Sequence, residues 1–358
     1  MWTVRLFRDD QLPSVFHEPF IKTGYRACET SLSECLRSAL YGTNETLNFW
    51  THFLPVFYYL WRIWRIGSEH DFINDPYMWP LLGVLICVCL YSLASSVAHL
   101  FSCLSERARH VCFFMDYSSI GMYSVACSIA YKCYSFPNNL IDTPYFNSYI
   151  QISVVNAVLM CTCGACASRF MDESLLRHLC RLSSFSLPFI ICNVPIVYRV
   201  FACPGDDCDG TSVALLRWQY LAAAVTALIF ATHFPERMAP GRFDVFFHSH
   251  QIFHVATTVS SNFHVDAMLA DMSQRRDVLE STVGMPTFWN SIGLLSAVFC
   301  INALLVLCFS VMIYSSPEPE HFYKIKHSEG TGKRQIAKNY RHRVECRNRA
   351  QQGSNVKR

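Results

Sequence analysis

Two histidines four residues apart, His250 and His254, are the residues whose type and spacing most directly suggest chemistry. On an α-helix, residues at this spacing share one face with about 5–6 Å between their Cβ atoms, which suits two ligands of one metal ion. The surrounding run, residues 245–263, carries almost no charge and predicts a helix. Asp244 follows a Pro-Gly turn and is expected to cap the N-terminus of that helix.

The composition indicates that this helix lies in a membrane. The 358-residue chain is 52% apolar and 14% aromatic, and only 16% of its residues are Asp, Glu, Lys or Arg, whereas soluble domains carry roughly 25%. The charges gather in short connectors and at both ends, separated by apolar intervals of about 20 residues, the length of a bilayer helix. We therefore predict an all-α integral membrane helical bundle, with spans at residues 47–66, 78–104, 111–136, 149–168, 182–201, 218–234, 245–263 and 288–314.

Eight spans place both ends of the chain on one side of the membrane, and the basic residues indicate which side. If the N-terminus is cytoplasmic, most of the 30 lysines and arginines face the cytosol, as the positive-inside rule requires. A capping-box pattern from Ser31 to Glu34 predicts a short amphipathic helix before the first span. The predicted organisation is a cytoplasmic N-terminal arm over residues 1–45, an eight-helix transmembrane domain over 46–314 and a basic cytoplasmic tail over 315–358.

This orientation places four ionisable side chains at one membrane level. His99 lies near the cytoplasmic end of the second span, and Asp116 lies near the cytoplasmic start of the third. The seventh span brings His250 and His254 to the same depth. Ionisable residues inside spans are rare and are functional candidates. Three imidazoles without a thiolate suit Zn²⁺ with a water in the fourth position, so His99, His250 and His254 are the candidate metal ligands.

Two further residues are candidates for chemistry beside this metal. Asp116 could take a proton from the bound water or orient a histidine ligand. Ser95, one turn before His99 on the same face, could hydrogen-bond the water or a substrate carbonyl. Zinc lowers the pKa of bound water to about 7, which makes hydroxide available at neutral pH. The alternative is a zinc ion that only ties three helices together.

The remaining histidines have simpler interpretations. His52, His233 and His264 are expected to bond neighbouring helices. His248 stands two residues before His250, so its side chain points to a different face of the helix.

Most of the 18 cysteines fall inside apolar runs and are interpreted as small buried hydrophobes. Cys161, Cys163 and Cys166 are separated by glycine and alanine among other residues, which favours a helix-packing surface over a metal cluster. Cys203 and Cys208 flank an acidic loop, and they are the one pair for which a disulfide is considered.

Several motifs together resemble the signature of the progestin and adipoQ receptor family, and within it the membrane progestin receptor branch. They are Ser95-x3-His99, Asp116, SHQIFH at 249–254, GYR at 24–26, TNETLNFWTHFLP at 43–55 and PERMAPGRFD at 235–244. The resemblance covers about residues 13 to 315. It implies a seven-helix core around zinc, with His99, His250 and His254 as ligands and Asp116 near the metal-bound water, plus an eighth transmembrane helix.

The resemblance implies two functions from different classes. Members of this branch resemble plasma-membrane receptors for progesterone-type steroids that signal rapidly, reportedly through G proteins. The family is also similar to alkaline ceramidases, so the same residues could serve zinc-dependent hydrolysis of a lipid amide. The expected partners are therefore the membrane, a steroid or sphingolipid ligand and a heterotrimeric G protein, with no nucleic acid.

Overall fold

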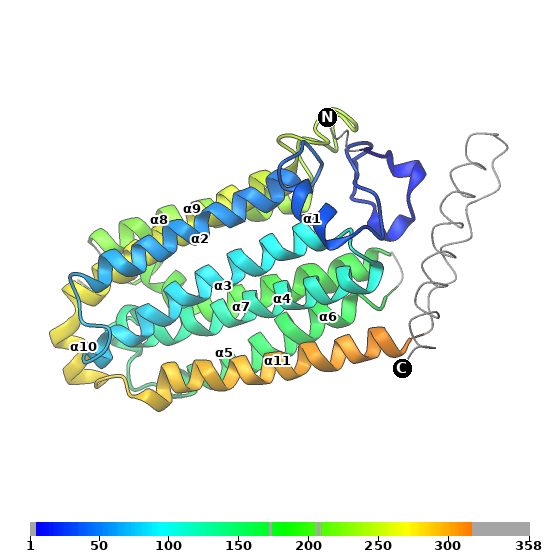
Figure 1. The fold of residues 1–358 in the computed structure, drawn as a ribbon. Coiled ribbons are helices and arrows are strands. Elements are labelled where there is room, and N and C mark those ends of the chain that lie inside the picture. The colour runs from blue at the N-terminus through cyan, green and yellow to red at the C-terminus, as the bar shows by residue number, and fades with distance from the viewer. Residues whose placement is uncertain (1–4, 172–173, 204, 206–207, 209, 317–358) are drawn as a thin grey trace, which may run out of the picture.

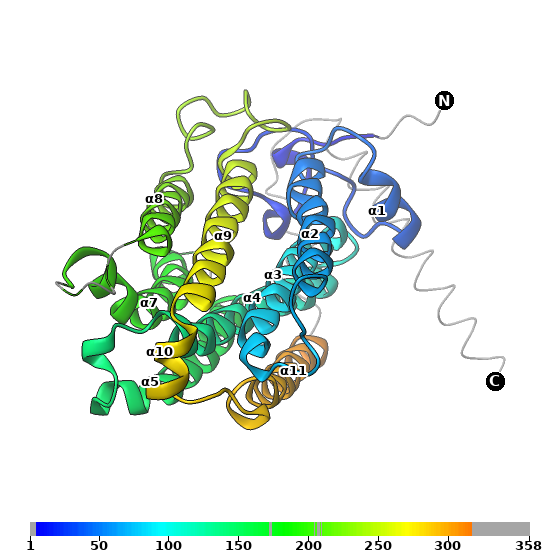
Figure 2. The same ribbon diagram turned by 90° about the vertical axis from the view of Figure 1, so that its left-hand side faces the viewer.

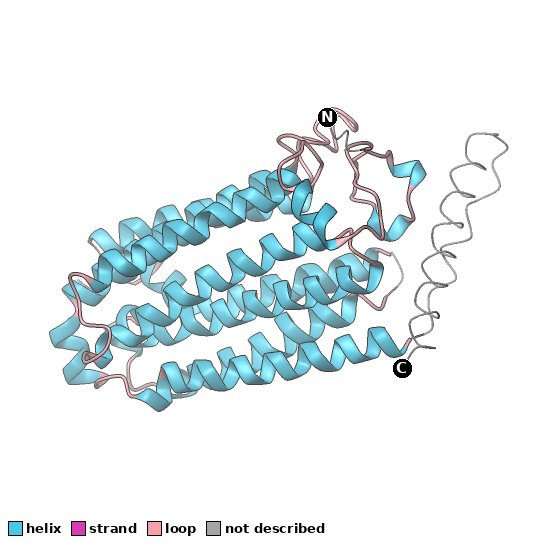
Figure 3. Cartoon of the chain, in the orientation of Figure 1, coloured by secondary structure: helices cyan, strands magenta, loops and turns pink. Residues whose placement is uncertain are grey.

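The computed structural model describes residues 5–316, except 172–173, 204, 206–207 and 209. Within these residues the chain is helical, and its β-structure is a single isolated bridge between Phe7 and Tyr25 (Figure 3). Long helices lie side by side along one axis (Figure 1). They are α2 (Thr46–Gly67), α3 (Trp79–Phe101), α4 (Glu106–Ala130), α7 (Leu175–Phe201), α8 (Thr211–Thr232), α9 (Ser249–Gln274) and α11 (Ile292–Ser315), with one composite rod of α5 (Pro144–Asn156), a π-helical stretch (Ala157–Gly164) and α6 (Ala165–Ser168).

The protein is an integral membrane helical bundle, as its composition predicts. Five of the described helical segments are long and apolar enough to cross a bilayer: residues 76–101, the composite rod, α7, α8 and α11. The outer faces of α8 and α11 expose apolar side chains such as Leu228 and Leu304, which suits contact with lipid. The more polar helices α2, α4 and α9 pack against these five. The total of eight spans stays a prediction.

Helix α11 lies outside the group formed by the other long helices. It packs mainly against α4, on the opposite side of the bundle from α8 and α9 (Figures 1 and 2). This placement agrees with a seven-helix core to which an additional helix is attached. Most of the basic tail expected at residues 315–358 falls outside the described residues.

Side-chain caps explain where several helices begin. Ser31 and Glu34 form the expected capping box at the start of α1 (Leu32–Ser38). Ser105 accepts a bond from Ala108 N at the start of α4, and Ser174 accepts one from Arg177 N at the start of α7. Because of the cap at Ser174, α7 begins several residues before the apolar run at residue 182, and it continues through both of its prolines, as expected for a kinked span.

The start of α9 differs from the prediction. The helix begins at Ser249, with His248 at the N-cap position, rather than at residue 245 after Asp244. Asp244 instead accepts a hydrogen bond from the Thr23 hydroxyl at 2.7 Å. The carboxylate of Glu236 takes over the cap, since its Oε2 accepts a bond from Ser249 N at 2.7 Å. A carboxylate at a helix N-terminus satisfies free N–H groups and is favoured by the helix dipole.

The cysteine expectations are confirmed in part, since Cys300 and Cys308 of α11 are exposed rather than buried. A disulfide joins Cys203 and Cys208, whose Cα atoms are 5.8 Å apart. The thiols of Cys161 and Cys166 are free and buried. A Cβ atom added at Gly164 would meet Ser184 Oγ at 2.7 Å, so the composite rod approaches α7 closely through its small residues.

A buried ion pair ties α7 to α9 at the end of the bundle away from the chain termini. Arg199 donates to both carboxylate oxygens of Asp271, at 2.6 and 2.8 Å, and each side chain is 1% exposed. Ser135 also donates to Asp271 at 2.6 Å. Hydrogen-bonded pairing of this kind lets two charges persist where water is absent.

We expect Asp271→Ala to destabilise the folded protein by about 3–5 kcal/mol, because it removes the carboxylate that accepts two hydrogen bonds from the buried Arg199 guanidinium. Reversible unfolding in mixed detergent micelles measures this change. The matched control is Glu69→Ala, which breaks an exposed pair with Arg65 and should cost less than about 1 kcal/mol. Equal losses of unfolding free energy in the two variants would show that the buried pair of Arg199 and Asp271 contributes no more than an exposed pair.

Candidate metal centre

Three imidazole rings from two helices converge near one end of the bundle, as the sequence predicts. His99 lies in the last turn of α3, and His250 and His254 lie in the first two turns of α9. One ring nitrogen from each histidine lies within 4.8 Å of the other two. The Nε2 atoms of His99 and His250 are 3.1 Å apart. This convergence makes the three rings a candidate ligand set for one ion.

The N-terminal arm fixes the end of α3 that carries His99. Arg26 donates to the carbonyl oxygens of His99 and Leu100, each at 2.7 Å, and to the hydroxyls of Ser38 and Ser102. A guanidinium at a helix C-terminus satisfies free carbonyl groups and interacts favourably with the helix dipole. Thr23 of the same arm donates to Asp244, so the arm also joins the end of α3 to the connector that carries the Glu236 cap of α9.

Two of the three rings are oriented by hydrogen bonds from α2 and the residue before it. Glu45 Oε2 lies 2.8 Å from His99 Nδ1 and also accepts a bond from Asn48 Nδ2. His254 Nδ1 lies 3.0 Å from Thr51 Oγ1 and 3.2 Å from the Asn48 carbonyl oxygen. When Nδ1 donates to such partners, Nε2 carries the free lone pair. The donor set thus fits Zn²⁺, which binds neutral imidazoles held by outer carboxylates and carbonyls.

Glu45, Asn48 and Thr51 lie within the TNETLNFWTHFLP motif, but the sequence did not predict their contacts with the histidines. The spacing of Glu45, Asn48 and Thr51 is a signal that could have been used, because residues three apart on a helix share a face. Only the tertiary structure shows what this face contacts, because the partners are far away in the sequence. His99 lies 54 positions from Glu45, and His254 lies 206 positions from Asn48.

Asp116 and Ser95 have no hydrogen bond to their side chains from any residue that the structure describes. Asp116 lies on α4 within electrostatic range of His99 and Arg169. Ser95 is 4% exposed and lies one turn before His99 on α3. A half-buried carboxylate and a buried hydroxyl without partners among the described residues have hydrogen-bonding capacity left for water or a ligand.

The other histidines divide into two groups. As predicted, His248 faces away from the triad, with Nε2 3.0 Å from the Asn44 carbonyl oxygen, and His264 bonds the neighbouring helix through the Tyr123 hydroxyl at 2.9 Å. His52 contacts the neighbouring helix by stacking on His254, with ring centroids 3.7 Å apart, but neither ring nitrogen makes the expected hydrogen bond to a described residue. The ring of His233 likewise has no hydrogen bond from a described residue of another helix, and its Nδ1 lies 3.9 Å from Glu236 of the same connector.

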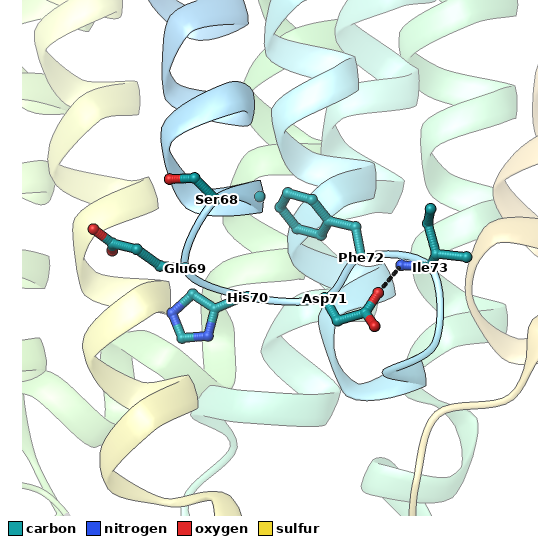
Figure 4. A pocket seen from close by; sticks show the side chains of 7 residues that line it. Ser68, Glu69, His70, Asp71, Phe72 and Ile73 are labelled. Carbon is teal, nitrogen blue, oxygen red and sulfur yellow. Dashed lines mark hydrogen bonds between the residues drawn. The ribbon is translucent and has the colours of Figure 1, made fainter.

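A hollow at the opposite end of the bundle is separate from this centre. It is formed by the loop after α2, residues 67–73 (Figure 4). Asp71 organises the loop by accepting a bond from Ile73 N at 2.8 Å. The loop therefore contributes no group to the three imidazoles.

Comparison with known proteins identifies the family of the chain. The model of the Haemolysin-III related family matches residues 40–265, which include all three histidines, Ser95 and Asp116. "Membrane progestin receptor gamma-B" of Danio rerio is 39% identical over 337 residues, covering 88% of this chain and 96% of the relative. "Membrane progestin receptor gamma" of Homo sapiens is 36% identical over 318 residues, covering 88% and 96%.

A second type of membrane progestin receptor is similarly related to this chain. "Membrane progestin receptor delta" of Homo sapiens is 37% identical over 318 residues, covering 87% of this chain and 92% of the relative. Both the family match and these relatives cover most of the helical bundle. The chain therefore belongs to the Haemolysin-III related, or progestin and adipoQ receptor, family, in the branch of the gamma and delta membrane progestin receptors.

Proposed function

We propose that this protein is a plasma-membrane receptor for a progestin-type steroid, built around a zinc ion held by His99, His250 and His254. The observation that carries the metal is the convergence of one ring nitrogen from each histidine within 4.8 Å. The steroid rests on the relatives, which are named membrane progestin receptors. Both chain ends are proposed to be cytoplasmic, which places the centre near the inner leaflet.

The bundle interior has the chemistry that a steroid site requires. Such a site is largely apolar and aromatic, with a few placed polar groups. Buried aromatic residues line the bundle between the long helices, and some carry hydroxyls bonded across helices: Tyr91 to Ser261 at 2.9 Å and Tyr131 to Asn193 at 3.0 Å. A steroid entering from lipid would replace or rearrange these contacts.

Zinc would couple such a change to one end of the bundle. Its ligands would lie on α3 and α9, so any relative movement of these helices changes the geometry at the end of the bundle where the N-terminal arm and the C-terminal end of α11 lie (Figure 1). A ligand that favours one helix arrangement shifts the population toward it. We propose that a heterotrimeric G protein binds at the cytoplasmic end and responds to this change in helix arrangement.

A second function is favoured by the free side chains of Asp116 and Ser95. In a zinc-dependent ceramidase-type hydrolase, the metal would supply a Lewis acid and a water of lowered pKa. Asp116 would take the proton of the attacking water, and the Ser95 hydroxyl would donate to the amide carbonyl oxygen of the lipid. The two functions share one centre and differ in what happens to the ligand.

The metal is tested by His250→Ala in the purified full-length protein. We expect about one zinc per chain in the wild type and a loss of most of it in the variant, because two imidazoles hold zinc far more weakly than three. Elemental analysis measures the content. His70→Ala, an exposed histidine in the loop after α2, is the matched control and should keep its zinc. Unchanged zinc in His250→Ala would refute the ligand set.

The role of Glu45 is tested by Glu45→Gln. We expect zinc affinity to fall about 10–100-fold, because the amide orients the His99 ring but no longer increases its basicity. Competition with a chromophoric chelator measures the affinity. Glu69→Gln, on the exposed pair with Arg65, should leave it unchanged. An affinity equal to that of the wild type would show that Glu45 does not act on the metal through His99.

The receptor and the hydrolase are separated by Asp116→Asn. We expect the variant to keep its zinc and to lose proton transfer by at least about 100-fold if hydrolysis occurs. Steroid-dependent signalling and release of sphingoid base from ceramide are measured in the same cells. If both proteins signal and neither releases sphingoid base from ceramide, the hydrolase function is rejected and the receptor function is retained. Turnover in the wild type that vanishes in the variant would establish the hydrolase.

A further inference from the structure

Three arginines outside the histidine triad lie together at the same end of the bundle. Arg109 stands in the first turn of α4, Arg169 follows α6, and Arg181 stands in the second turn of α7. The guanidinium groups of Arg109 and Arg169 contact one ring, that of Phe113, at 5.2 and 4.6 Å from its centroid. Arg181 lies within electrostatic range of Arg169, so the two positive charges repel each other. We call these three residues the arginine cluster.

The arginine cluster holds more positive charge than its described neighbours neutralise. Arg109 has a carboxylate partner, Glu18, at 2.6 Å. Arg169 donates to neutral acceptors, His110 Nδ1 at 3.0 Å and the Tyr117 hydroxyl at 3.2 Å. Arg181 makes no hydrogen bond to a described residue. Among the described residues, the acidic group Asp116 also lies within electrostatic range of Arg169.

Several N–H groups of the cluster are buried without an acceptor among the residues that the structure describes. They are Nε of Arg109 and both Nε and Nη2 of Arg181. Leaving charged donors unpaired away from water costs more than leaving neutral ones, and native proteins avoid it. Two guanidinium groups with free donors, beside the charge of Arg169, therefore favour an anion that supplies several oxygen acceptors. Phosphate meets this need, because its oxygens match the guanidinium fork.

The surface beside Arg181 indicates where such a phosphate comes from. Leu175, Leu176 and Leu179, on the first turns of α7, are 74%, 61% and 51% exposed. In a membrane protein, exposed leucines of this kind contact acyl chains, and basic groups between helices at the cytoplasmic level bind lipid headgroups. A lipid could thus lay its chains along α7 while its phosphate reaches the guanidinium groups.

We propose that the arginine cluster binds the phosphate of an anionic phospholipid, for which phosphatidic acid is the simplest probe. This site is distinct from the triad and independent of the proposed steroid function. It adjoins the triad through Phe113, whose ring meets the His99 ring edge-on with centroids 6.1 Å apart. The bound lipid would complete the hydrogen bonding of Arg109 and Arg181 at this end of the bundle.

The test uses the full-length protein in phosphatidylcholine nanodiscs with and without phosphatidic acid. We expect phosphatidic acid to raise the Tm of the wild type, and native mass spectrometry to show one retained lipid. Arg181→Gln should weaken that binding about tenfold or more, because it removes a charge-assisted pair of hydrogen bonds. In phosphatidylcholine alone the variant should be at least as stable as the wild type, because Arg181 has no described partner to lose.

Two comparisons make the result decisive. Arg65→Gln removes an exposed arginine near the opposite end of the bundle and should leave the response to phosphatidic acid intact. Inorganic phosphate added to plain nanodiscs should give no comparable rise in Tm. The proposal is overturned if Arg181→Gln responds to phosphatidic acid like the wild type, if it is equally destabilised in both kinds of nanodisc, or if inorganic phosphate reproduces the effect.

Discussion

The convergence of the three imidazoles depends on two helix ends being held against each other: the C-terminus of α3 and the N-terminus of α9. Arg26 binds the last carbonyl groups of α3, and Glu236 binds the first N–H of α9. Each contact places a charge where the helix dipole favours it and satisfies backbone groups that a helix cannot satisfy itself. Both charged residues come from segments outside the long helices, so the connectors position the centre.

The bundle as a whole obeys the same requirement. In a membrane, polar groups that lack water must find partners within the protein. At the end away from the termini, Arg199 and Asp271 pair with each other, and Arg275 donates to the carbonyl oxygens of Tyr134 and Phe136. Around the histidines, the partners come from α2 and the N-terminal arm. Where the described residues offer no partner, as at the side chains of Asp116, Ser95 and Arg181, a ligand or water is the natural complement.

The proposed receptor and the proposed hydrolase therefore make different uses of one arrangement. A receptor needs the zinc-linked helices to have two arrangements that a ligand can distinguish. A hydrolase needs Asp116 and Ser95 to face the metal at hydrogen-bonding distance from the substrate. A site that held zinc only as a tie between α3 and α9 would not need a free carboxylate beside it. The unpartnered Asp116 thus argues against a purely structural role.

The helical membrane class followed from composition, because long apolar intervals leave a chain few ways to satisfy its backbone in a bilayer. The three histidines could also be chosen in advance, since rare ionisable residues fall at one depth once the orientation is fixed. Local rules succeeded at the Ser31 capping box. They failed at Asp244, because Thr23, 221 positions away, binds the Asp244 carboxylate and Glu236 of the same connector caps α9 in its place.

Contacts between residues that lie far apart in the chain could not be predicted from the sequence. The contact of Glu45 with His99, the stacking of His52 on His254 and the pairing of Arg199 with Asp271 join residues that lie far apart along the chain. Sequence periodicity tells which face of a helix is polar, but not which neighbour that face meets. The sequence by itself determined the helices, the membrane and the ligand candidates. The tertiary structure decided how those candidates are oriented, because hydrogen bonds between side chains depend on distances that only packing sets.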